Sequence, residues 1–314
     1  MSEAARKVLR IHFSRMLKHE AGTIDGSDVA ELHDMRVAVR RMRAAVRLFR
    51  PYVPKKQAAY LRKDLRRLGR ALGPARDYDV MLANLEVYRA DLPAQEKEAI
   101  GLVVQRWQKQ RARARKAMLA YLASKRYGLL KQRVRAFLDG DPPAAARTVD
   151  GNEVLPAATP FQEPLVESEI PSLLASRYEK LLAYGPSLHG ASVATLHALR
   201  IDCKRLRYAL EFFRESLPPQ AAAAIEDIRR AQDHLGVIQD AYVAGRVLRK
   251  LLEKWQHAHD DVRYPAAARE ALCGYLAHCD DRVRTNAHAF PAIWENLTGL
   301  EFRQRLHVIA TTLP

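Results

Sequence analysis

The sequence predicts an all-α protein made of two repeated antiparallel helical bundles, and three observations support this. Only 14 glycines occur among 314 residues, while the helix formers Ala, Leu and Arg are abundant. A segment at 32–50, LHDMRVAVRRMRAAVRLFR, returns 164 residues later at 196–214 as LHALRIDCKRLRYALEFFR. The connections between expected helices are short, which favours antiparallel packing of sequential helices.

Turn and cap residues divide the first half into six expected helices. Their ranges are 2–21, 28–50, 55–73, 74–90, 93–124 and 127–138. Ser27 or Asp28 caps the second helix, and Pro74 fits the first turn of the fourth. Gly73, like Gly236 in the second half, is expected to be a left-handed C-terminal cap. The second half is expected to have helices at 170–184, 192–216, 218–235, 237–257 and 264–289, and then a shorter C-terminal piece.

Each copy of the repeat carries a His followed by basic residues three, seven and ten positions later. The eight residues are His33, Arg36, Arg40, Arg43 and His197, Arg200, Lys204, Arg207. At 100° per residue these offsets fall within a stripe about 80° wide on a helix. An apolar face runs beside the first stripe, through Met35, Val39, Met42, Val46 and Phe49. Because like charges one turn apart repel, the two stripes predict an anionic partner.

The repeat continues into the following helix. With one residue deleted, LRRLGRALGPARD (65–77) matches IRRAQDHLGVIQD (228–240), so that Arg66 corresponds to Arg229. Both arginines lie off the leucine face of their helix, and they point either to solvent or to the ligand of the stripes. Asp77 and Asp240 follow the two glycines by four residues, as first-turn carboxylates of a new helix do.

The net charge of +16 is distributed unevenly along the chain. Residues 1–138 carry +19, residues 139–172 carry −6, and residues 173–314 carry +3. The acidic stretch also contains six prolines, which is typical of an extended linker. We therefore expect a first bundle at 1–138, a linker at 139–170 and a second bundle at 171–314. The basic excess favours a polyanionic partner such as nucleic acid, polyphosphate or an acidic membrane surface.

Several functional classes find no support in the sequence. No apolar run approaches the roughly 18 residues that a membrane span needs, and the N-terminus lacks the apolar core of a secretory signal. The three cysteines form no CxxC pair, which favours a cytoplasmic protein. Nucleotide-binding loops, HExxH and carboxylate clusters at metal-ligand spacing are missing from the sequence. We expect no catalytic residues, no metal and no cofactor, and therefore a protein that is not an enzyme.

Three motifs resemble the CHAD family, the conserved-histidine α-helical domain. They are H-x-x-R-V-x-x-R-R-x-R at 33–43, LGPARDYDV at 72–80 and H-x-x-R-I-x-x-K-R-L-R-Y-A-L-E at 197–211. The resemblance spans about residues 1–135 and 168–300. The ExExK signature of the CYTH domain, which is fused to some relatives, is absent from this sequence, so the chain resembles a stand-alone CHAD protein.

The resemblance implies two helical bundles related by a pseudo-twofold axis, with a basic pore or groove that binds inorganic polyphosphate. The two stripes, together with Arg66 and Arg229, would line this channel, and polyphosphate granules in the cytoplasm become a possible partner. The two halves are not evenly charged, because the second half is nearly neutral: Asp233 and Gln239 stand where the first half has Arg70 and Arg76. A nucleic-acid binder is the main alternative, although no aromatic residue is interleaved with the basic residues for base stacking. A triphosphatase is the second alternative.

Overall fold

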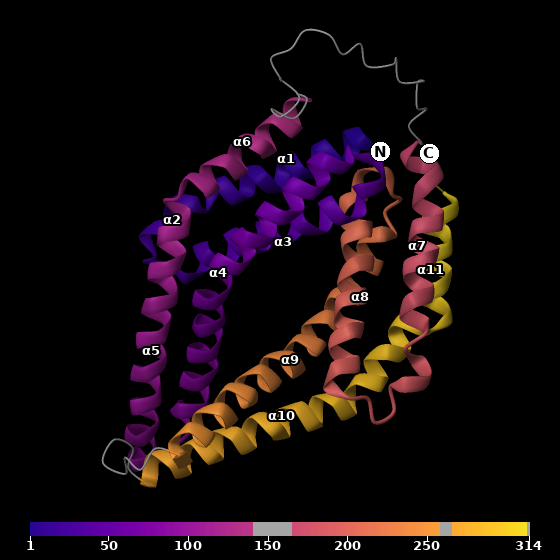
Figure 1. Ribbon diagram of the computed structural model, residues 1–314. Helices are drawn as coiled ribbons and strands as arrows, with labels where there is room; N and C mark the ends of the chain where they lie inside the picture. Colours follow the sequence, from indigo (N-terminus) through magenta and orange to yellow (C-terminus); the bar gives the residue numbers. More distant parts are fainter. Residues whose placement is uncertain (141–164, 258–265, 313–314) are drawn as a thin grey trace. The chain divides into compact units, whose positions relative to one another are not determined.

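The computed structural model describes residues 1–140, 165–257 and 266–312. Within these ranges the chain is helical and has no β-strand, which confirms the all-α fold class (Figure 1). Most of the expected linker falls in residues 141–164, outside the described residues. In the described part of the chain, no helix is long and apolar enough to span a membrane.

The fold consists of long α-helices and short 3₁₀ turns. The α-helices are α1 (Ser2–Lys18), α2 (Glu20–Asp25), α3 (Val29–Leu48), α4 (Lys55–Ala90), α5 (Ala94–Leu122), α6 (Lys125–Asp139), α7 (Val166–Leu182), α8 (Val193–Phe212), α9 (Ala221–His257), α10 (Ala266–Thr298) and α11 (Leu300–Thr311). The 3₁₀ turns are η1 (Arg50–Tyr52), η3 (Gly185–Ser187) and η4 (Arg214–Ser216).

The helices form two compact units. Unit 1 comprises residues 1–76 and 114–170, and unit 2 comprises residues 77–113 and 171–314. The boundaries fall inside α4, α5 and α7, so that each of these helices contributes to both units. The domains expected at 1–138 and 171–314 follow the repeat along the sequence, and that division stays a prediction.

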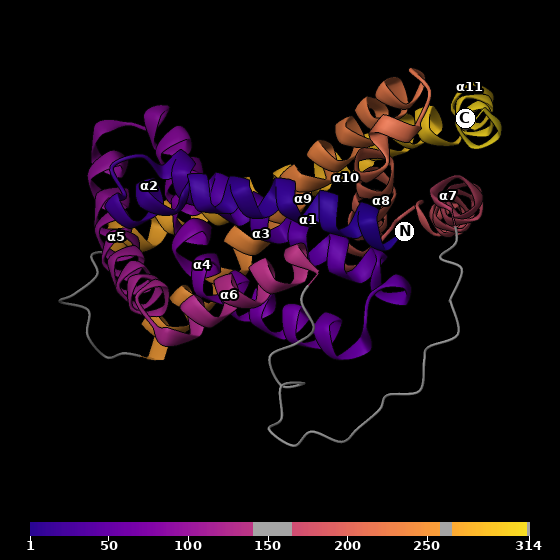
Figure 2. The same ribbon diagram turned by 90° about the horizontal axis from the view of Figure 1, so that it is seen from above.

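Unit 1 is built around α1 and α3, which lie next to one another (Figure 2). Helix α1 also contacts α2 and α6. The apolar face expected for the first stripe helix is buried, because Met35, Met42 and Phe49 have no exposed surface and Val39 is 1% exposed. This burial is what fixes the direction in which the basic residues of α3 project.

Unit 2 is built around α9, which contacts α8, α10 and α11 and runs beside α10 in both views (Figures 1 and 2). The second part of α4 and the first part of α5 complete a hydrophobic cluster of this unit. Large members of this cluster are Met81, Leu85, Ile100, Trp107, Leu248, Leu272 and Tyr275. Residues 77–113 therefore pack with the second half of the chain.

The repeat is visible in the helix boundaries. Asp28 caps α3 by accepting a hydrogen bond from the backbone N–H of Ala30 at 2.7 Å. Ser192, 164 residues later, caps α8 by accepting from the N–H of Thr195 at 3.1 Å. Both helices have 20 residues, and each is followed by a 3₁₀ turn. Of the two residues expected to cap α3, Ser27 and Asp28, the cap is Asp28.

The expected helix break at Gly73–Pro74 is wrong. Helix α4 runs through both residues, and Gly73 does not have a positive φ. Pro74 removes only the hydrogen bond to the carbonyl of Arg70, whereas Leu72 and Ala75 continue the buried face. The burial of apolar side chains on both sides of Pro74 thus outweighs the loss of one backbone hydrogen bond, and the helix continues.

The corresponding break at Gly236 is also wrong, because α9 is a single helix across that position. Asp77 and Asp240 accordingly lie inside helices rather than in a first turn. The first helix was expected to end at Gly22, but it kinks at His19 and continues as α2 to Gly26, which has φ 75°. The guanidinium of Arg115 stabilises this end by donating to three carbonyls of α2, at 2.6 to 3.2 Å.

Candidate functional site

The first basic stripe projects from α3 beside the buried apolar face. His33 and Arg43 are exposed, and Arg36 and Arg40 are half-buried. In the second copy on α8, His197 is exposed, and Arg200, Lys204 and Arg207 are half-buried. The first stripe belongs to unit 1 and the second to unit 2, and the channel expected between them stays a prediction.

Gly73 and Gly236 each lie against an arginine of the stripe of their own copy. The Nη1 of Arg36 donates to the carbonyl oxygen of Gly73 at 2.8 Å, and a Cβ at Gly73 would lie 3.1 Å from the same nitrogen. A Cβ at Gly236 would lie 3.7 Å from the Nη2 of Arg200. The glycines therefore provide a flat helix surface for an arginine, rather than the helix ends predicted from the sequence.

The histidine at the head of each stripe has a different neighbour in the two copies. Burial, followed by the positive charge of Arg76, lowers the pKa of His33 below 6.5, with smaller contributions from Arg40 and Arg36 and partial compensation by Asp34. At the equivalent place, the Nδ1 of His197 donates to the Oε1 of Gln239 at 2.6 Å. An amide thus replaces a cation beside the second histidine.

A basic pocket of about 1080 Å³ lies where α3, η1 and α4 meet in unit 1. Its twelve lining residues include nine cations and no carboxylate. The cations are Arg43, Arg47, Arg50, Lys55, Arg62, Lys63, Arg66, Arg67 and Arg70, and the remaining residues are Val46, Ala58 and Ala59. We call this set the basic pocket. It brings together Arg43 and Arg66, which the sequence analysis placed in one site.

The other seven cations of the basic pocket were not among the predicted site residues. Arg47 and Arg50 continue the stripe of α3 for two turns beyond Arg43 at the same helical spacing, so the signal was present. Arg62 and Arg70 lie one turn on either side of Arg66 on α4. What the sequence did not reveal is that the turn at η1 folds these two rows toward one pocket.

Electrostatic crowding in the basic pocket is visible at Arg43. Burial, and then the charges of Arg47, Arg66 and Arg36, lower the pKa of its guanidinium. Arg67 has a carboxylate nearby, because its Nη1 lies 3.4 Å from the Oδ1 of Asp64. The pocket therefore holds a large excess of positive charge that a bound polyanion would neutralise.

Two predicted site residues of the second copy, Arg207 and Arg229, have carboxylate partners instead. The Nη1 of Arg207 lies 3.1 Å from Glu211, and its Nε donates to the Oε1 of Gln232 at 3.2 Å. Arg229 lies 2.7 Å from Glu226 and 3.7 Å from Asp233. Since salt bridges already occupy part of their donors, Arg207 and Arg229 differ from Arg43 and Arg66.

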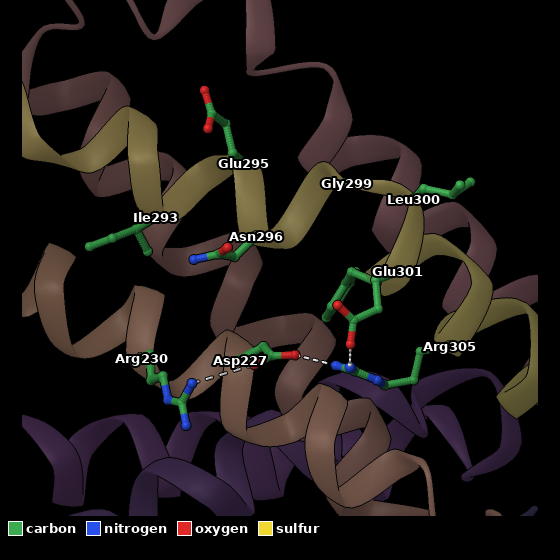
Figure 3. Close-up of a pocket in the computed structure, with 10 residues that line it drawn as sticks. Asp227, Arg230, Ile293, Glu295, Asn296, Gly299, Leu300, Glu301 and Arg305 are labelled. Carbon is green, nitrogen blue, oxygen red and sulfur yellow. Dashed lines mark hydrogen bonds and ion pairs between the residues drawn. The ribbon is translucent and has the colours of Figure 1, made fainter.

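A structural ion-pair triad recurs in both copies. In unit 1, Asp64 is 5% exposed and accepts from Arg67 and from Arg133 of α6, the latter at 2.6 Å. In unit 2, Asp227 pairs with Arg230 and with Arg305 of α11 (Figure 3).

The unit 2 triad borders a pocket of about 310 Å³, where the Nη2 of Arg305 also donates to the Oε1 of Glu301 at 2.6 Å. The triads attach the last helix of each copy to its long helix.

The described ranges contain no group of three or more His, Cys, Asp or Glu side chains that could hold a metal ion. Cys203 and Cys279 are buried and Cys273 is exposed, and none of them forms a disulfide. The basic pocket and its adjoining stripe are therefore the strongest candidate site.

Comparisons with known proteins identify relatives of this chain. Residues 7–249 match the family model for the CHAD domain. The crystal structure of the CHAD domain from the plant Ricinus communis is similar over 92% of each chain, with 28% sequence identity and a TM-score of 0.68. PptA from Streptomyces chartreusis shares the fold over 94% of this chain and 99% of its own, with 18% identity and a TM-score of 0.67. No curated protein matches.

Proposed function

This chain belongs to the CHAD domain family, and we propose that it binds inorganic polyphosphate through the basic pocket and the adjoining stripe of the first copy. The single observation that carries this proposal is a pocket lined by nine cations and no carboxylate. A polyphosphate chain with about one negative charge per phosphate would balance these cations. Association with polyphosphate granules in the cytoplasm belongs to the same proposal.

The geometry of the basic pocket suits a flexible chain of phosphates. Arg62, Arg66 and Arg70 follow one another on α4 about one turn apart, at about 6 Å along the axis. Guanidinium groups bind phosphate oxygens through paired N–H donors, whereas Lys55 and Lys63 act as point charges. A ladder of donors on a rigid helix therefore fits a repeating anion without any base to read.

The lining of the pocket argues against nucleic acid as the preferred ligand. Its uncharged residues are Val46, Ala58 and Ala59, and none of the lining residues is aromatic. Single-stranded nucleic acids gain much of their affinity from stacking on aromatic side chains, and duplex readout uses Asn or Gln beside Arg. The pocket offers charge and little else.

We propose binding without hydrolysis. Phosphoryl transfer is typically catalysed by a metal held by carboxylates next to a cationic clamp, and the lining of the basic pocket supplies only the clamp. Incubation of the chain with tripolyphosphate and Mg²⁺ or Mn²⁺ should release no phosphate above the buffer rate. Turnover that is lost in a pocket variant would support the triphosphatase alternative instead.

The decisive experiment compares long-chain polyphosphate, duplex DNA and single-stranded RNA at one salt concentration. The parent chain should bind polyphosphate most tightly. The double variant Arg62→Glu/Arg66→Glu removes two charged hydrogen-bonding groups, each contributing about 1.5 kcal/mol or more. Because the two groups are exposed, we expect a loss of roughly tenfold to a hundredfold in affinity.

A matched control is the double variant Arg113→Glu/Lys116→Glu on α5. Both residues are exposed and outside the pocket, and the change in net charge is the same. This control should retain most of the affinity, and both variants should keep the helical circular dichroism of the parent. Equal losses in the two variants, or tighter binding of either nucleic acid, would contradict the proposed site or ligand.

A further inference from the structure

Three carboxylates of the second copy stand at positions where the first copy has pocket cations. Glu211 corresponds to Arg47 through the 164-residue spacing of the stripes. After the one-residue deletion, Glu226 corresponds to Lys63 and Asp233 corresponds to Arg70. All three positions in the first copy line the basic pocket.

Taken together, the second-copy residues at positions equivalent to the basic pocket carry much less positive charge than the pocket itself. We use the name second-copy corner for the charged residues at positions equivalent to the basic pocket, which are Arg207, Glu211, Arg214, Glu226, Arg229, Arg230 and Asp233. These four arginines and three carboxylates have a net charge of +1, compared with +9 for the basic pocket. The repeat thus conserves the helices but not the charge.

The carboxylates of the second-copy corner contact its arginines directly. Glu226 accepts from the Nε and Nη2 of Arg229 at 2.8 and 2.7 Å, and it lies 3.5 Å from Arg230. Glu211 lies 3.1 Å from Arg207, with both side chains largely buried. Hydrogen bonding to Arg229 lowers the pKa of Glu226, and Glu226 in turn raises the pKa of Arg229, which is the signature of a mutually stabilised pair.

A phosphate chain would have to compete with these internal partners. A fork-shaped guanidinium that already binds a carboxylate through two N–H groups keeps only three of its five donors for a phosphate. The carboxylates would also repel the incoming anion at one-turn spacing. In the basic pocket, by contrast, Arg47 sits where Glu211 stands in the second copy, and its charge lowers the pKa of Arg43.

We propose that Glu211, Glu226 and Asp233 determine which copy of the repeat binds polyanions, because they prevent the second-copy corner from binding them. This inference rests on the proposed function of the basic pocket. It assigns polyphosphate binding to the basic pocket and a structural role to the second-copy corner.

The test starts from the variant Arg62→Glu/Arg66→Glu, in which the basic pocket is impaired. Into this background the charge-swap variant introduces the first-copy residues, Glu211→Arg, Glu226→Lys and Asp233→Arg. Binding of long-chain polyphosphate should recover by at least tenfold. The dependence of log K on log salt should steepen by about 2, since each added contact to a single-stranded polyanion contributes about 0.7.

A charge control raises the net charge equally elsewhere in unit 2, through Glu98→Lys on α5 and Glu270→Lys and Asp281→Lys on α10. In this control the affinity for long-chain polyphosphate should recover by less than threefold. Because Glu211 is largely buried, an isosteric variant with Glu211→Gln, Glu226→Gln and Asp233→Asn provides a second measurement that preserves side-chain volume. That variant should also recover polyphosphate binding, but less than the charge-swap variant does.

The possible results separate the two proposals. Absence of polyphosphate binding by the parent chain overturns both the proposed function and this inference. Parent binding with no recovery in the charge-swap and isosteric variants overturns this inference alone. Recovery of equal size in the charge control, or parental affinity retained by Arg62→Glu/Arg66→Glu, also overturns it.

Discussion

The two stripe-facing glycines allow a matched test of how the arginines are placed. Alanine is favoured over glycine by about 1 kcal/mol inside a helix. At Gly236 the new Cβ would lie 3.7 Å from Arg200, an ordinary van der Waals distance. Gly236→Ala should therefore stabilise the chain by about 0.5–1 kcal/mol.

At Gly73 the same substitution has a different cost. The new Cβ would lie 3.1 Å from the Nη1 of Arg36, and the neighbouring guanidinium would have to move away from the Gly73 carbonyl. A hydrogen bond from a charged donor contributes about 1.5–3 kcal/mol, and we take the lower end because Arg36 is only half-buried. Gly73→Ala should therefore be neutral or destabilising, about 1–2 kcal/mol less stable than Gly236→Ala.

Urea denaturation followed by circular dichroism measures this difference, with the m-value as a check that the denatured state is unchanged. A double-mutant cycle isolates the cause. In the background Arg36→Ala, the substitution Gly73→Ala should become stabilising, because the Cβ no longer meets a guanidinium. Equal stabilisation by both glycine substitutions in the parent chain would refute the placement of Arg36 against Gly73.

Three further predictions follow from the charges in unit 1. Arg67 pairs with Asp64, which leaves eight cations of the basic pocket to contact phosphates. If all eight do so, log K for polyphosphate should fall with log salt with a slope of about −6. A slope shallower than about −2 would indicate a smaller site. The lowered pKa of His33 means that its neutral form is favoured in the fold, so this contribution to stability is present above about pH 6.5 and is lost as the pH falls through the folded pKa. A bound polyanion should raise that pKa, so affinity measured by titration calorimetry should increase as the pH falls through this window, and a profile unchanged in His33→Gln would exclude His33 as the cause. Arg133→Ala should lower the free energy of unfolding by about 1–2 kcal/mol in urea denaturation, since buried Asp64 would keep only the 3.4 Å contact with Arg67; unchanged stability would contradict the triad.

Much of the local structure was determined by the sequence alone. The apolar spacing from Met35 to Phe49 predicted a helix with one buried face, and that face is fully buried. The cap was predicted at Ser27 or Asp28, because a side-chain oxygen before an amphipathic run satisfies the first N–H groups, and the structure shows Asp28 in this role. Family resemblance came from the same segments, whose His and basic residues recur at fixed offsets, and the family match confirms it.

The sequence was misread where local preference and tertiary burial disagree. Gly73–Pro74 is a strong local signal for a helix end, yet the buried face continues through Leu72 and Ala75. Gly236 was misread for the same reason. A pattern of helix breakers does not reveal how much apolar surface lies on both sides of the break, nor that an arginine from another helix needs the space.

The charge of the candidate site was decided by tertiary structure. Seen along the sequence, Arg43 and Arg207 are equivalent members of two similar stripes. In the fold, Arg43 joins eight other cations around one pocket, whereas Arg207 contacts Glu211 and Gln232. Electrostatic free energy depends on distances between side chains from different helices, and a helical periodicity determines only the positions within one helix. The sequence therefore determined which faces are basic, and it also placed Glu211 one turn from Arg207 and Glu226 one turn from Arg229 on the same helices. The packing of α3 against α4 decided that the cations of two different helices surround one pocket.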